Sequence, residues 1–400
     1  MTFHVMIIPT LNCPSNCKYC WGSEKESEMM DVQVIKEIDK WLVGFRDDHV
    51  HFTFHGGEPL IAGYDFYKEA LPILKNSETH KEAGFSLQSN LWLLDEKLAK
   101  LFSEYSVAIS TSIDGPKEIN DYQRGEGYFD KTMKGYNIAI ENGVNVSFIS
   151  TFTSYSKDFR DEIYGFFLKN RYNFKLHAAL PSLRGNNADI WALAPEEHGK
   201  LLIGILDNYL NDLDKIEIKD FDHICKSSLI RRGTLCTFAD CMGDTLAIGW
   251  DGNIYPCYRF VGMKDYVMGN VYNHPSMNEL MKSNAWNKLM EFKDYVDENC
   301  NDCDYIKFCR GGCPYNGIVS SIEDDSNSNN NNTNSDFKNE SFKIESSISI
   351  DPQCLAYKMI FKEVSNRANK EFLKSNINLF NSNNENKTNK FSIMDLMLKK

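Results

Sequence analysis

Hydrophobic and polar positions in the first half of the chain follow two different periods. Short runs rich in β-branched and aromatic residues predict six strands, at 3–8, 51–55, 85–89, 107–112, 146–152 and 174–179. Between these runs the apolar residues recur at helical spacing, as in the segment 31–45. Its apolar face consists of Val34, Ile35, Ile38, Trp41 and Leu42. Alternation of strand and helix predicts a parallel sheet with helices outside it.

About six strand–helix units close only part of an eight-stranded barrel. We therefore expect an α/β fold whose first part is a partial (β/α)6 TIM-like barrel. In such folds the chemistry lies at the carboxyl ends of the strands. A further helical pattern at 195–213 ends this half of the chain.

The second half has fewer periodic segments and most of the cysteines. It predicts a smaller α+β, cysteine-rich domain that is organised by metal. We expect domains at 1–215 and 216–365, followed by a partly disordered extension at 366–400. Asn and Ser dominate the segment 324–339, which we interpret as an inserted loop, and 381–390, which we interpret as a mobile tail.

Composition and charge exclude several classes of partner. The 400 residues carry a formal net charge of −12 and show no Lys/Arg-rich block, which argues against a nucleic-acid backbone as partner. The N-terminal residues do not resemble a signal peptide, and no apolar stretch approaches the roughly 18 residues of a membrane helix. We expect a cytoplasmic protein without a membrane partner, in a compartment where thiols are reduced.

The twelve cysteines are strongly clustered. Three lie within 13–20 and nine lie between 225 and 354. In a reducing compartment this clustering indicates metal binding rather than disulfides. The first group, Cys13, Cys17 and Cys20, has the spacing C-x3-C-x2-C. Three thiolates leave one iron of a four-iron cluster open for a substrate, although spacing alone also allows a zinc site.

Polar residues follow the other predicted strands. Gly56, Gly57 and Glu58 come after the second strand, where residues without Cβ let the backbone approach a ligand and a carboxylate accepts bonds from an ammonium group. Asn90 follows the third strand. The fourth strand ends at Ser112 and leads to Asp114, and Arg124, which suits a carboxylate, comes twelve residues after Ser112.

The cysteine spacing, with Tyr19 before the third cysteine, resembles the signature of the radical S-adenosylmethionine (SAM) superfamily. The resemblance implies that SAM binds the open iron and is cleaved reductively to a 5′-deoxyadenosyl radical, which abstracts hydrogen from a substrate. Gly56-Gly57-Glu58 is similar to the motif that holds the SAM amino group in this family. Gln88-Ser89-Asn90 resembles the family's Gln-Thr-Asn-Gly element, with Ser for Thr and Leu91 for Gly. Ser112 and Arg124 resemble the SAM-contacting pair of the sulfatase-maturase branch.

The later cysteines resemble the seven-cysteine SPASM domain, which holds auxiliary 4Fe–4S clusters. The matching residues are Cys241, Cys257, Cys300, Cys303, Cys309, Cys313 and Cys354. Two fully ligated clusters need eight thiolates, and Cys236 is the natural eighth. The family pattern implies a first set of Cys236, Cys241, Cys257 and Cys313 and a second set of Cys300, Cys303, Cys309 and Cys354. Cys225 remains as a buried or free thiol, and a zinc-ribbon-like site is the alternative for this region.

The SPASM resemblance implies a peptide or protein substrate. In sulfatase maturases the residue after the matching cysteine is an Asp that acts as a base, whereas here it is Tyr258. We therefore favour modification of a ribosomally made peptide, by a thioether or another cross-link, over oxidation of Cys or Ser to formylglycine. Asp114 and Tyr258 are the candidates for handling the substrate proton.

The resemblance also implies partners. A flavodoxin- or ferredoxin-type protein would supply electrons. Because the first predicted strand begins near residue 3, we expect any leader-binding module to be a separate protein. Two alternatives remain, an iron–sulfur electron carrier and an enzyme of cofactor assembly. An electron carrier has no use for an open iron or a SAM-binding loop.

Overall fold

The computed structural model describes residues 2–20, 22, 27–44, 49–181, 190–239, 241–318 and 348–381. The predicted insert 324–339 and the tail beyond residue 381 lie outside these residues. The chain packs as two units that are interleaved along the sequence. The first unit comprises Met1–Thr151, Arg184–Ile190 and Cys241–Glu291, and the second comprises Phe152–Leu183, Trp191–Asp240 and Phe292–Lys400. The predicted domain boundaries at 215/216 and 365/366 stay a prediction.

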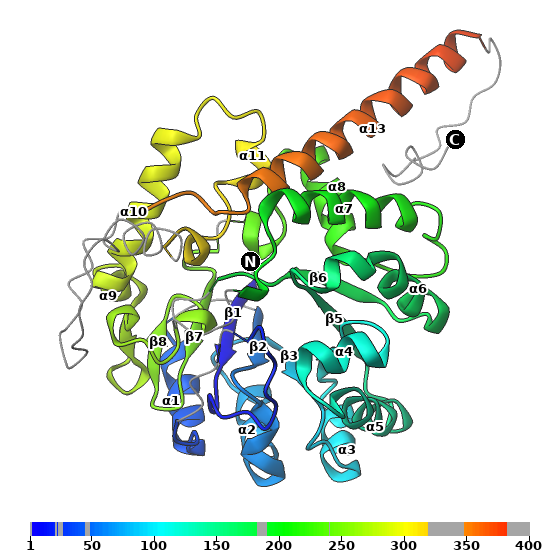
Figure 1. Cartoon of the computed structure of the whole chain (residues 1–400). Helices are drawn as coiled ribbons and strands as arrows, with labels where there is room; N and C mark the ends of the chain where they lie inside the picture. The colour runs from blue at the N-terminus through cyan, green and yellow to red at the C-terminus, as the bar shows by residue number, and fades with distance from the viewer. Residues whose placement is uncertain are drawn as a thin grey trace, which may run out of the picture. The chain divides into compact units, whose positions relative to one another are not determined.

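Parallel strands in chain order form the sheet of the first unit (Figure 1). They are β1 (Thr2–Ile7), β2 (His49–Phe54), β3 (Glu82–Ser89), β4 (Ala108–Ser112) and β5 (Val146–Phe152). The sixth predicted strand is β6 (Phe174–Ala178), in the second unit. All six strands predicted from the sequence are confirmed, with bounds that differ by a few residues.

A short meander from the second half of the chain extends this sheet on the other side of β1. Strand β7 (Thr245–Ile248) pairs with β1 in parallel, and β8 (Asn253–Tyr255) and β9 (Gly269–Asn270) follow as antiparallel neighbours. The sequence pattern did not predict these strands, since runs of two to four residues are too short to show a period. The sheet consequently brings the segment containing Cys241 and Cys257 into the first unit.

Helices cover one face of the sheet in the first unit (Figure 1). They are α1 (Val32–Leu42), α2 (Gly63–Lys75), α3 (Glu96–Glu104), α4 (Lys117–Arg124) and α5 (Tyr128–Glu141). The first unit also contains the short helix α9 (Met277–Leu280) and four 3-10 turns, η1 (Pro59–Ala62), η5 (Tyr258–Phe260), η6 (Lys264–Tyr266) and η7 (Val271–Asn273). The predicted helix at 31–45 is α1, which begins after Asp31 because the Asp31 carboxylate accepts a hydrogen bond from the Gln33 N–H. Its predicted apolar face is buried.

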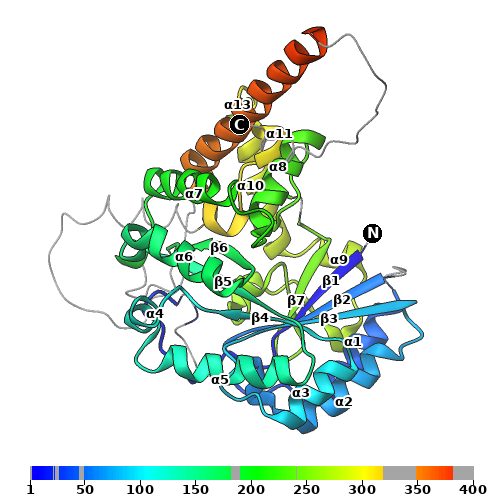
Figure 2. The same cartoon turned by 90° about the vertical axis from the view of Figure 1, so that its right-hand side faces the viewer.

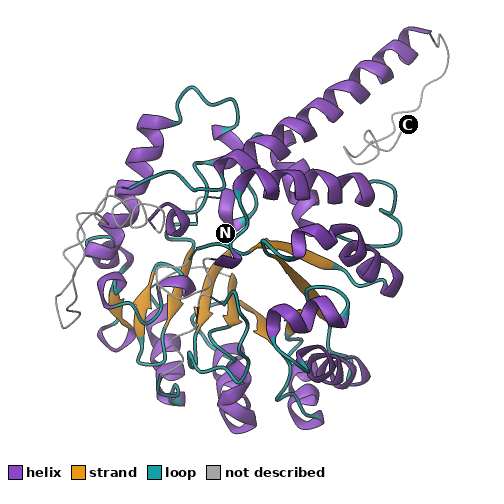
Figure 3. Ribbon diagram, viewed as in Figure 1, coloured by secondary structure: helices purple, strands orange, loops and turns teal. Residues whose placement is uncertain are grey.

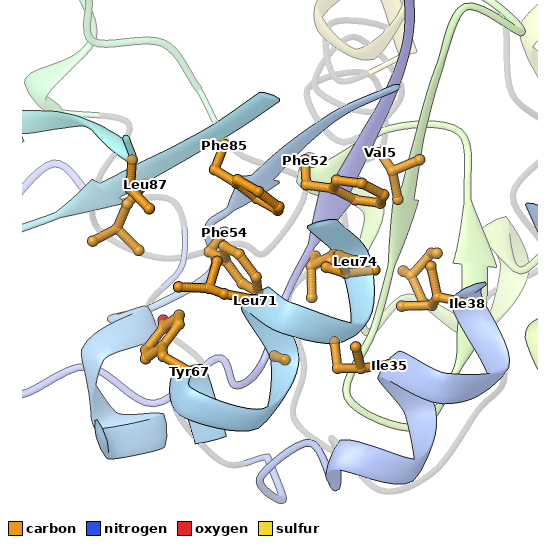
Figure 4. Packing of buried hydrophobic residues seen from close by; sticks show 14 of the residues in the cluster. Val5, Ile35, Ile38, Phe52, Phe54, Tyr67, Leu71, Leu74, Phe85 and Leu87 are labelled. Carbon is orange, nitrogen blue, oxygen red and sulfur yellow. The ribbon is translucent and has the colours of Figure 1, made fainter. Parts of the chain in front are cut away.

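The core of the first unit lies between the sheet and these helices. Phe52 and Phe54 of β2 are essentially unexposed and pack against Leu71 and Leu74 of α2 and Ile38 of α1 (Figure 4). Side chains alternate between the two faces of a strand. Because every second residue is a large apolar side chain buried against the helices, the other residues of each strand face away from the helices. The burial of the sheet on this side holds the strand ends in register and so positions the loops that follow them.

The second unit is mainly helical (Figures 2 and 3). Besides β6 it contains η2 (Ser156–Phe159), α6 (Arg160–Asn170), α7 (Pro195–Tyr209), α8 (Lys219–Ile230), η4 (Cys236–Phe238), α11 (Ile306–Cys309) and α13 (Cys354–Asn381), while α10 (Asn284–Asn299) has residues in both units. The helix predicted at 195–213 is α7, which packs along α13. The predicted extension beyond 365 is helical up to Asn381. Within the part of the chain that the structure describes, no helix is both long and apolar enough to cross a membrane.

Candidate active site

The candidate site lies where the parallel strands of the first unit end. Strand β1 leads to the loop that carries Cys13, β2 is followed by His55 and the glycine pair, and β3 is followed by Asn90. Asp114 lies two residues after β4. Because the strands are parallel and in register, their carboxyl ends meet at one edge of the sheet.

The glycine pair after β2 makes room for the loop that leads to Cys13. A Cβ on Gly56, whose φ is +125°, would lie 2.4 Å from the Thr10 carbonyl oxygen, and one on Gly57 would lie 2.3 Å from the Asn12 carbonyl oxygen. The Gly57 N–H donates to Thr10 O at 3.0 Å and the Glu58 N–H donates to Asn12 O at 2.8 Å. In the structure these glycines therefore admit a neighbouring stretch of the same chain, a reason for them that the sequence interpretation did not include.

Glu58 joins the ends of β2 and β3. Its carboxylate, in a side chain that is 1% exposed, accepts hydrogen bonds from Leu60 N at 2.9 Å, Ser89 Oγ at 2.8 Å and Asn90 N at 2.8 Å. Burial raises the pKa of Glu58 to about 7, against the effect of these hydrogen bonds. The motif residue is thus held rigidly and ionises near neutral pH.

The three cysteines of the first group share one loop. The Ser15 hydroxyl lies 3.0 Å from Cys13 Sγ and 3.7 Å from Cys17 Sγ, and the Cys20 N–H donates to Cys17 O at 3.1 Å. Burial raises the pKa of the Cys13 thiol, and the nearby charge of Cys17 adds to the rise. Burial likewise raises the pKa of Cys17, and Cys20 adds to it. The three sulfur atoms are therefore close enough to influence one another.

The surroundings of these thiols fit an anionic, thiolate-ligated cluster. The Asn90 amide lies 3.8 Å from Cys13 Sγ, and the Arg124 Nη1 lies 3.9 Å from Cys17 Sγ. The Arg124 guanidinium opposes the burial-induced rise in the Cys17 pKa, so it favours the thiolate. Amide and guanidinium donors of this kind stabilise cluster sulfur. Among the described residues, no three His, Cys, Asp or Glu side chains converge closely enough to surround a single ion.

A buried ion pair holds Arg124 in place. The Asp114 carboxylate, which is 0% exposed, accepts from Arg124 Nε at 2.9 Å and Nη2 at 2.8 Å. It also accepts from Tyr19 OH at 2.8 Å, Gln123 Nε2 at 2.9 Å and Thr151 N at 2.9 Å. Hydrogen bonds thus join Tyr19, Asp114 and Arg124, and Arg124 in turn reaches Cys17. The Asp114 carboxylate has no exposed edge through which to reach a substrate.

Ser112 lies at the end of β4 and is half-buried. Its hydroxyl accepts a hydrogen bond from Gln88 Nε2 of the neighbouring strand at 3.2 Å. The structure thus places it in the same row of strand ends as Asn90 and Glu58. Its predicted contact with SAM stays a prediction.

Tyr258 lies beside the end of β2. Its ring stacks on the His55 ring with a centroid distance of 4.4 Å and an interplanar angle of 28°. The His55 Nδ1 accepts a hydrogen bond from Gly56 N at 2.7 Å, which places the His55 proton on Nε2. Sequence reasoning did not single out His55, and its position directly before the glycine pair is the signal that could have done so.

Four cysteines of the second unit also lie near one another. Burial raises the pKa of the Cys300 thiol, and Cys354 and Cys303 add to the rise. Burial also raises the pKa of Cys309 to about 12, again with contributions from Cys354 and Cys303. These four residues are the set expected for the second auxiliary cluster; the thiols influence one another electrostatically, and their grouping as ligands stays a prediction.

The other auxiliary set is divided between the two units. Cys241 and Cys257 belong to the first unit, and Cys236 and Cys313 belong to the second. Their grouping stays a prediction. Cys225 is 3% exposed in α8, and burial raises its pKa to about 12, in agreement with its interpretation as a buried thiol.

Comparison with protein families defines the class. Residues 7–166 match the radical SAM superfamily, and residues 236–304 match the SPASM family, an iron–sulfur cluster-binding domain. An uncharacterized protein of Methanothermobacter thermautotrophicus is 53% identical over 233 residues, which cover 58% of this chain and 89% of that protein. The chain belongs to the radical SAM superfamily.

Two further similarities are informative. A cysteine-type anaerobic sulfatase-maturating enzyme of Clostridium perfringens is 27% identical over 319 residues, which cover 75% of this chain and 85% of the enzyme. The solved structure of native anSMEcpe with bound AdoMet and Cp18Cys peptide superposes with a TM-score of 0.76 at 23% identity, covering 92% of this chain and 100% of that one. The latter similarity shows a shared fold, a partial barrel followed by a SPASM domain.

These findings confirm the predicted class and its cofactors. The chain is a radical SAM enzyme that uses SAM and a 4Fe–4S cluster, and its SPASM domain binds auxiliary iron–sulfur clusters. Relatives of the chain include cysteine-type and serine-type anaerobic sulfatase-maturating enzymes.

Proposed function

We propose that this enzyme abstracts a hydrogen atom from a side chain of a peptide or protein and thereby modifies that substrate after translation. The observation that carries the proposal is the stacking of Tyr258 on His55, 4.4 Å between ring centroids. It places a phenol from the segment of Cys257 beside the Gly-Gly-Glu loop. A phenol, which we propose handles the substrate proton, thus lies at the strand ends where SAM is expected to bind.

Cys13, Cys17 and Cys20 would hold the SAM-binding cluster. Their shared loop and the Asn90 and Arg124 donors directed at Cys13 and Cys17 support this assignment. The reduced cluster with bound SAM supplies a 5′-deoxyadenosyl radical for hydrogen abstraction. We assign SAM contacts to seven residues: Tyr19, Gly56, Gly57, Glu58, Asn90, Ser112 and Arg124.

Arg124 would act through one nitrogen. Its Nε and Nη2 are both occupied by Asp114, which leaves Nη1 near Cys17 Sγ and 3.3 Å from Tyr128 OH. An Arg fixed in this way offers a preorganised positive charge to the SAM carboxylate without losing side-chain freedom on binding. We assign Asp114 to this positioning role rather than to the role of base, because five hydrogen bonds already occupy its carboxylate.

Tyr258 would take or relay the substrate proton at its phenol oxygen. Stacking on His55 restricts the ring, and a restricted ring holds the oxygen in one place as general acid–base chemistry requires. Sulfatase maturases carry Asp at this position, so the proton acceptor here differs in chemistry as well as in length. This difference supports peptide cross-linking, as in a thioether, over formylglycine formation.

The auxiliary clusters would be held by the two cysteine sets. The thiols of Cys303 and Cys354 contribute to the raised pKa values of Cys300 and Cys309, and Cys303 also contributes to that of Cys354. This electrostatic coupling supports the second set. Clusters held there would supply an acceptor for the electron left on the substrate after hydrogen abstraction, or a site that holds the substrate. Together with the SAM cluster, the two auxiliary clusters make three 4Fe–4S clusters in all. The proposal also includes a flavodoxin- or ferredoxin-type reductant, a separate leader-binding protein and a cytoplasmic location.

Formylglycine formation is the second candidate. The 27% identity with a cysteine-type anaerobic sulfatase-maturating enzyme over 75% of this chain favours it. The two candidates predict different products from the same starting peptide. Formylglycine replaces a cysteine thiol by an aldehyde, whereas a thioether keeps the sulfur and loses two hydrogens.

The test uses anaerobically reconstituted enzyme and short cysteine-containing peptides, including one with the sequence of a sulfatase site and others from reading frames near this gene. Peptides deuterated at cysteine and at its neighbours are incubated with SAM and dithionite. Deuterium appearing in 5′-deoxyadenosine together with a peptide that retains sulfur supports cross-linking. An aldehyde product establishes the second candidate, and 5′-deoxyadenosine without deuterium from any peptide or protein substrate contradicts the proposal.

A further inference from the structure

Asp351 is a buried carboxylate of the second unit that the sequence motifs do not include. It is 0% exposed. Its Oδ2 accepts hydrogen bonds from Cys313 N at 2.8 Å and Asn316 Nδ2 at 2.9 Å. The same oxygen accepts from Tyr357 OH at 3.2 Å, and Oδ1 accepts from Gln353 N at 2.9 Å. The Asp351 side chain thus links residues that follow it closely to Cys313, which lies 38 positions before it in the sequence.

The backbone of Asp351 is fixed from both sides as well. Its carbonyl oxygen accepts from Cys354 N at 2.9 Å. Gly312, which has φ +87°, lies so close that a Cβ there would be 2.3 Å from the Asp351 Cβ. The Gly312 N–H in turn donates to Cys309 O at 3.0 Å. Asp351 therefore contacts the backbone of Cys313 with its side chain and the backbone of Cys354 with its main chain.

The chemistry of this residue argues for a specific task. A buried carboxylate costs free energy unless it is hydrogen-bonded, and four donors at two oxygens meet that requirement here. The donors include the N–H of Cys313 and the N–H of Gln353, the residue before Cys354. An apolar side chain could fill the same volume without this cost, but it could not hold two backbone N–H groups at once.

We propose that Asp351 is a positioning residue that fixes Cys313 and Cys354, and with them one ligand of each auxiliary cluster, in a single rigid arrangement. The inference rests on the ligand sets assigned under Proposed function. Its carboxylate is fully buried and bonded to protein donors, so Asp351 would act through the cysteines. It joins the segment of Cys313, through its side chain, to the segment of Cys354, through its carbonyl oxygen.

The test compares Asp351→Asn with Asp302→Asn in the full chain. Asp302 is exposed and lies next to Cys303, so its substitution removes the same charge near another proposed ligand without removing a buried contact. Asn at 351 keeps the size of the side chain but turns an NH2 group toward either the Gln353 N–H or the Cys313 N–H, and two donors repel. Both variants are reconstituted anaerobically, and iron content and electron paramagnetic resonance of the reduced clusters are measured.

Wild type and Asp302→Asn should retain about twelve irons per chain, as three four-iron clusters require, whereas Asp351→Asn should lose about four or more. The signal of the first cluster should still change when SAM is added to Asp351→Asn. Unchanged iron content and unchanged auxiliary-cluster signals in Asp351→Asn would overturn the inference. Far-UV circular dichroism of each variant reports whether the chain has folded.

A milder variant covers the case in which Asp351→Asn does not fold. Tyr357→Phe removes one donor to Asp351 and leaves the bonds to Cys313 N and Gln353 N. It should keep its iron but shift the reduction potential of an auxiliary cluster, and a wild-type potential would contradict the inference. Cys354→Ala tests the assignment of Cys354 as a ligand separately from the positioning role of Asp351. If it keeps full iron, the ligand assignment fails; if it loses iron while both Asp351→Asn and Tyr357→Phe behave as wild type, only the role of Asp351 fails.

Discussion

The Asp114 carboxylate accepts two hydrogen bonds from the Arg124 guanidinium, at 2.9 Å from Nε and 2.8 Å from Nη2, in a place where Asp114 is 0% and Arg124 6% exposed. The third guanidinium nitrogen lies 3.9 Å from Cys17 Sγ. A positive charge is therefore fixed beside a proposed cluster ligand by its ion pair with Asp114.

Removing this partner should destabilise the protein. Asp114→Asn leaves the Arg124 charge buried without a counter-ion, and breaking a buried pair in this way costs about 3 to 5 kcal/mol. Urea unfolding of the cluster-free chain measures the loss. Asp130→Asn is the matched control, because Asp130 pairs with Lys117 on the surface, where little or no change is expected. Equal stabilities of the two variants would show that the Asp114–Arg124 pair is not buried as described.

Glu58 should make stability depend on pH. Burial raises its pKa from an ordinary value of 4.5 to about 7 in the folded chain, so the native state keeps this proton to higher pH than the unfolded state does. Its contribution to stability therefore falls as pH rises from about 4.5 to about 7, by about 3 kcal/mol. Glu58→Gln cannot ionise and should lack this component. The difference in unfolding free energy between wild type and Glu58→Gln, measured across this range, should shrink or change sign as pH rises; a constant difference contradicts the buried carboxylate.

Leu91 occupies a backbone conformation that suits glycine. Its φ is +65° and its side chain is 0% exposed. Both Leu91→Gly and Leu91→Ala lose the buried side chain, at about 2 to 5 kcal/mol. Glycine avoids the cost of a left-handed Cβ, so Leu91→Gly should be about 1 kcal/mol more stable than Leu91→Ala.

The control for this prediction lies in the adjacent strand. Leu87 is 1% exposed within β3, where the backbone is extended. There the order should reverse, with Leu87→Ala about 0.5 to 1 kcal/mol more stable than Leu87→Gly. The same order at both positions, measured by denaturant unfolding, would show that Leu91 carries no backbone strain.

Tyr258→Phe isolates the phenol oxygen of Tyr258. Phenylalanine keeps the stacking on His55, so cluster content and SAM binding should match wild type. Product formation should fall by about 10²- to 10⁴-fold, the usual contribution of a positioned acid or base. The ratio of 5′-deoxyadenosine to modified peptide is the sensitive measurement, because the variant would still abstract hydrogen but would complete the peptide modification less often. An unchanged ratio would remove Tyr258 from the proton-handling role.

The strands and the first cysteine loop were predictable because they depend on local patterns. Six alternating runs identified the parallel strands, and three cysteines within eight residues identified a metal loop. Their common location also followed, since parallel strands end at the same edge of a sheet. The replacement of the family's Gly by Leu91 was visible in the sequence, whereas only the structure shows that Leu91 has a positive φ, which glycine favours.

Other features depend on contacts that no local pattern contains. Strand β7 joins β1 although the two are more than two hundred residues apart, and its four residues carry no periodic signal. Asp351 contacts Cys313 across 38 positions. The stacking of Tyr258 on His55 likewise joins residues from different parts of the chain. Such pairings are selected by tertiary packing, and a single sequence does not record them.

The most direct test of the account is the iron content and SAM cleavage of the anaerobically reconstituted chain, compared with a variant in which Cys13, Cys17 and Cys20 are all alanine. The wild-type chain should hold about twelve irons and release 5′-deoxyadenosine steadily when SAM and dithionite are added. The triple variant should hold about eight irons and release none. About four irons in the wild-type chain would contradict the two auxiliary clusters, and SAM cleavage by the triple variant would contradict the assignment of the radical-generating site to these cysteines.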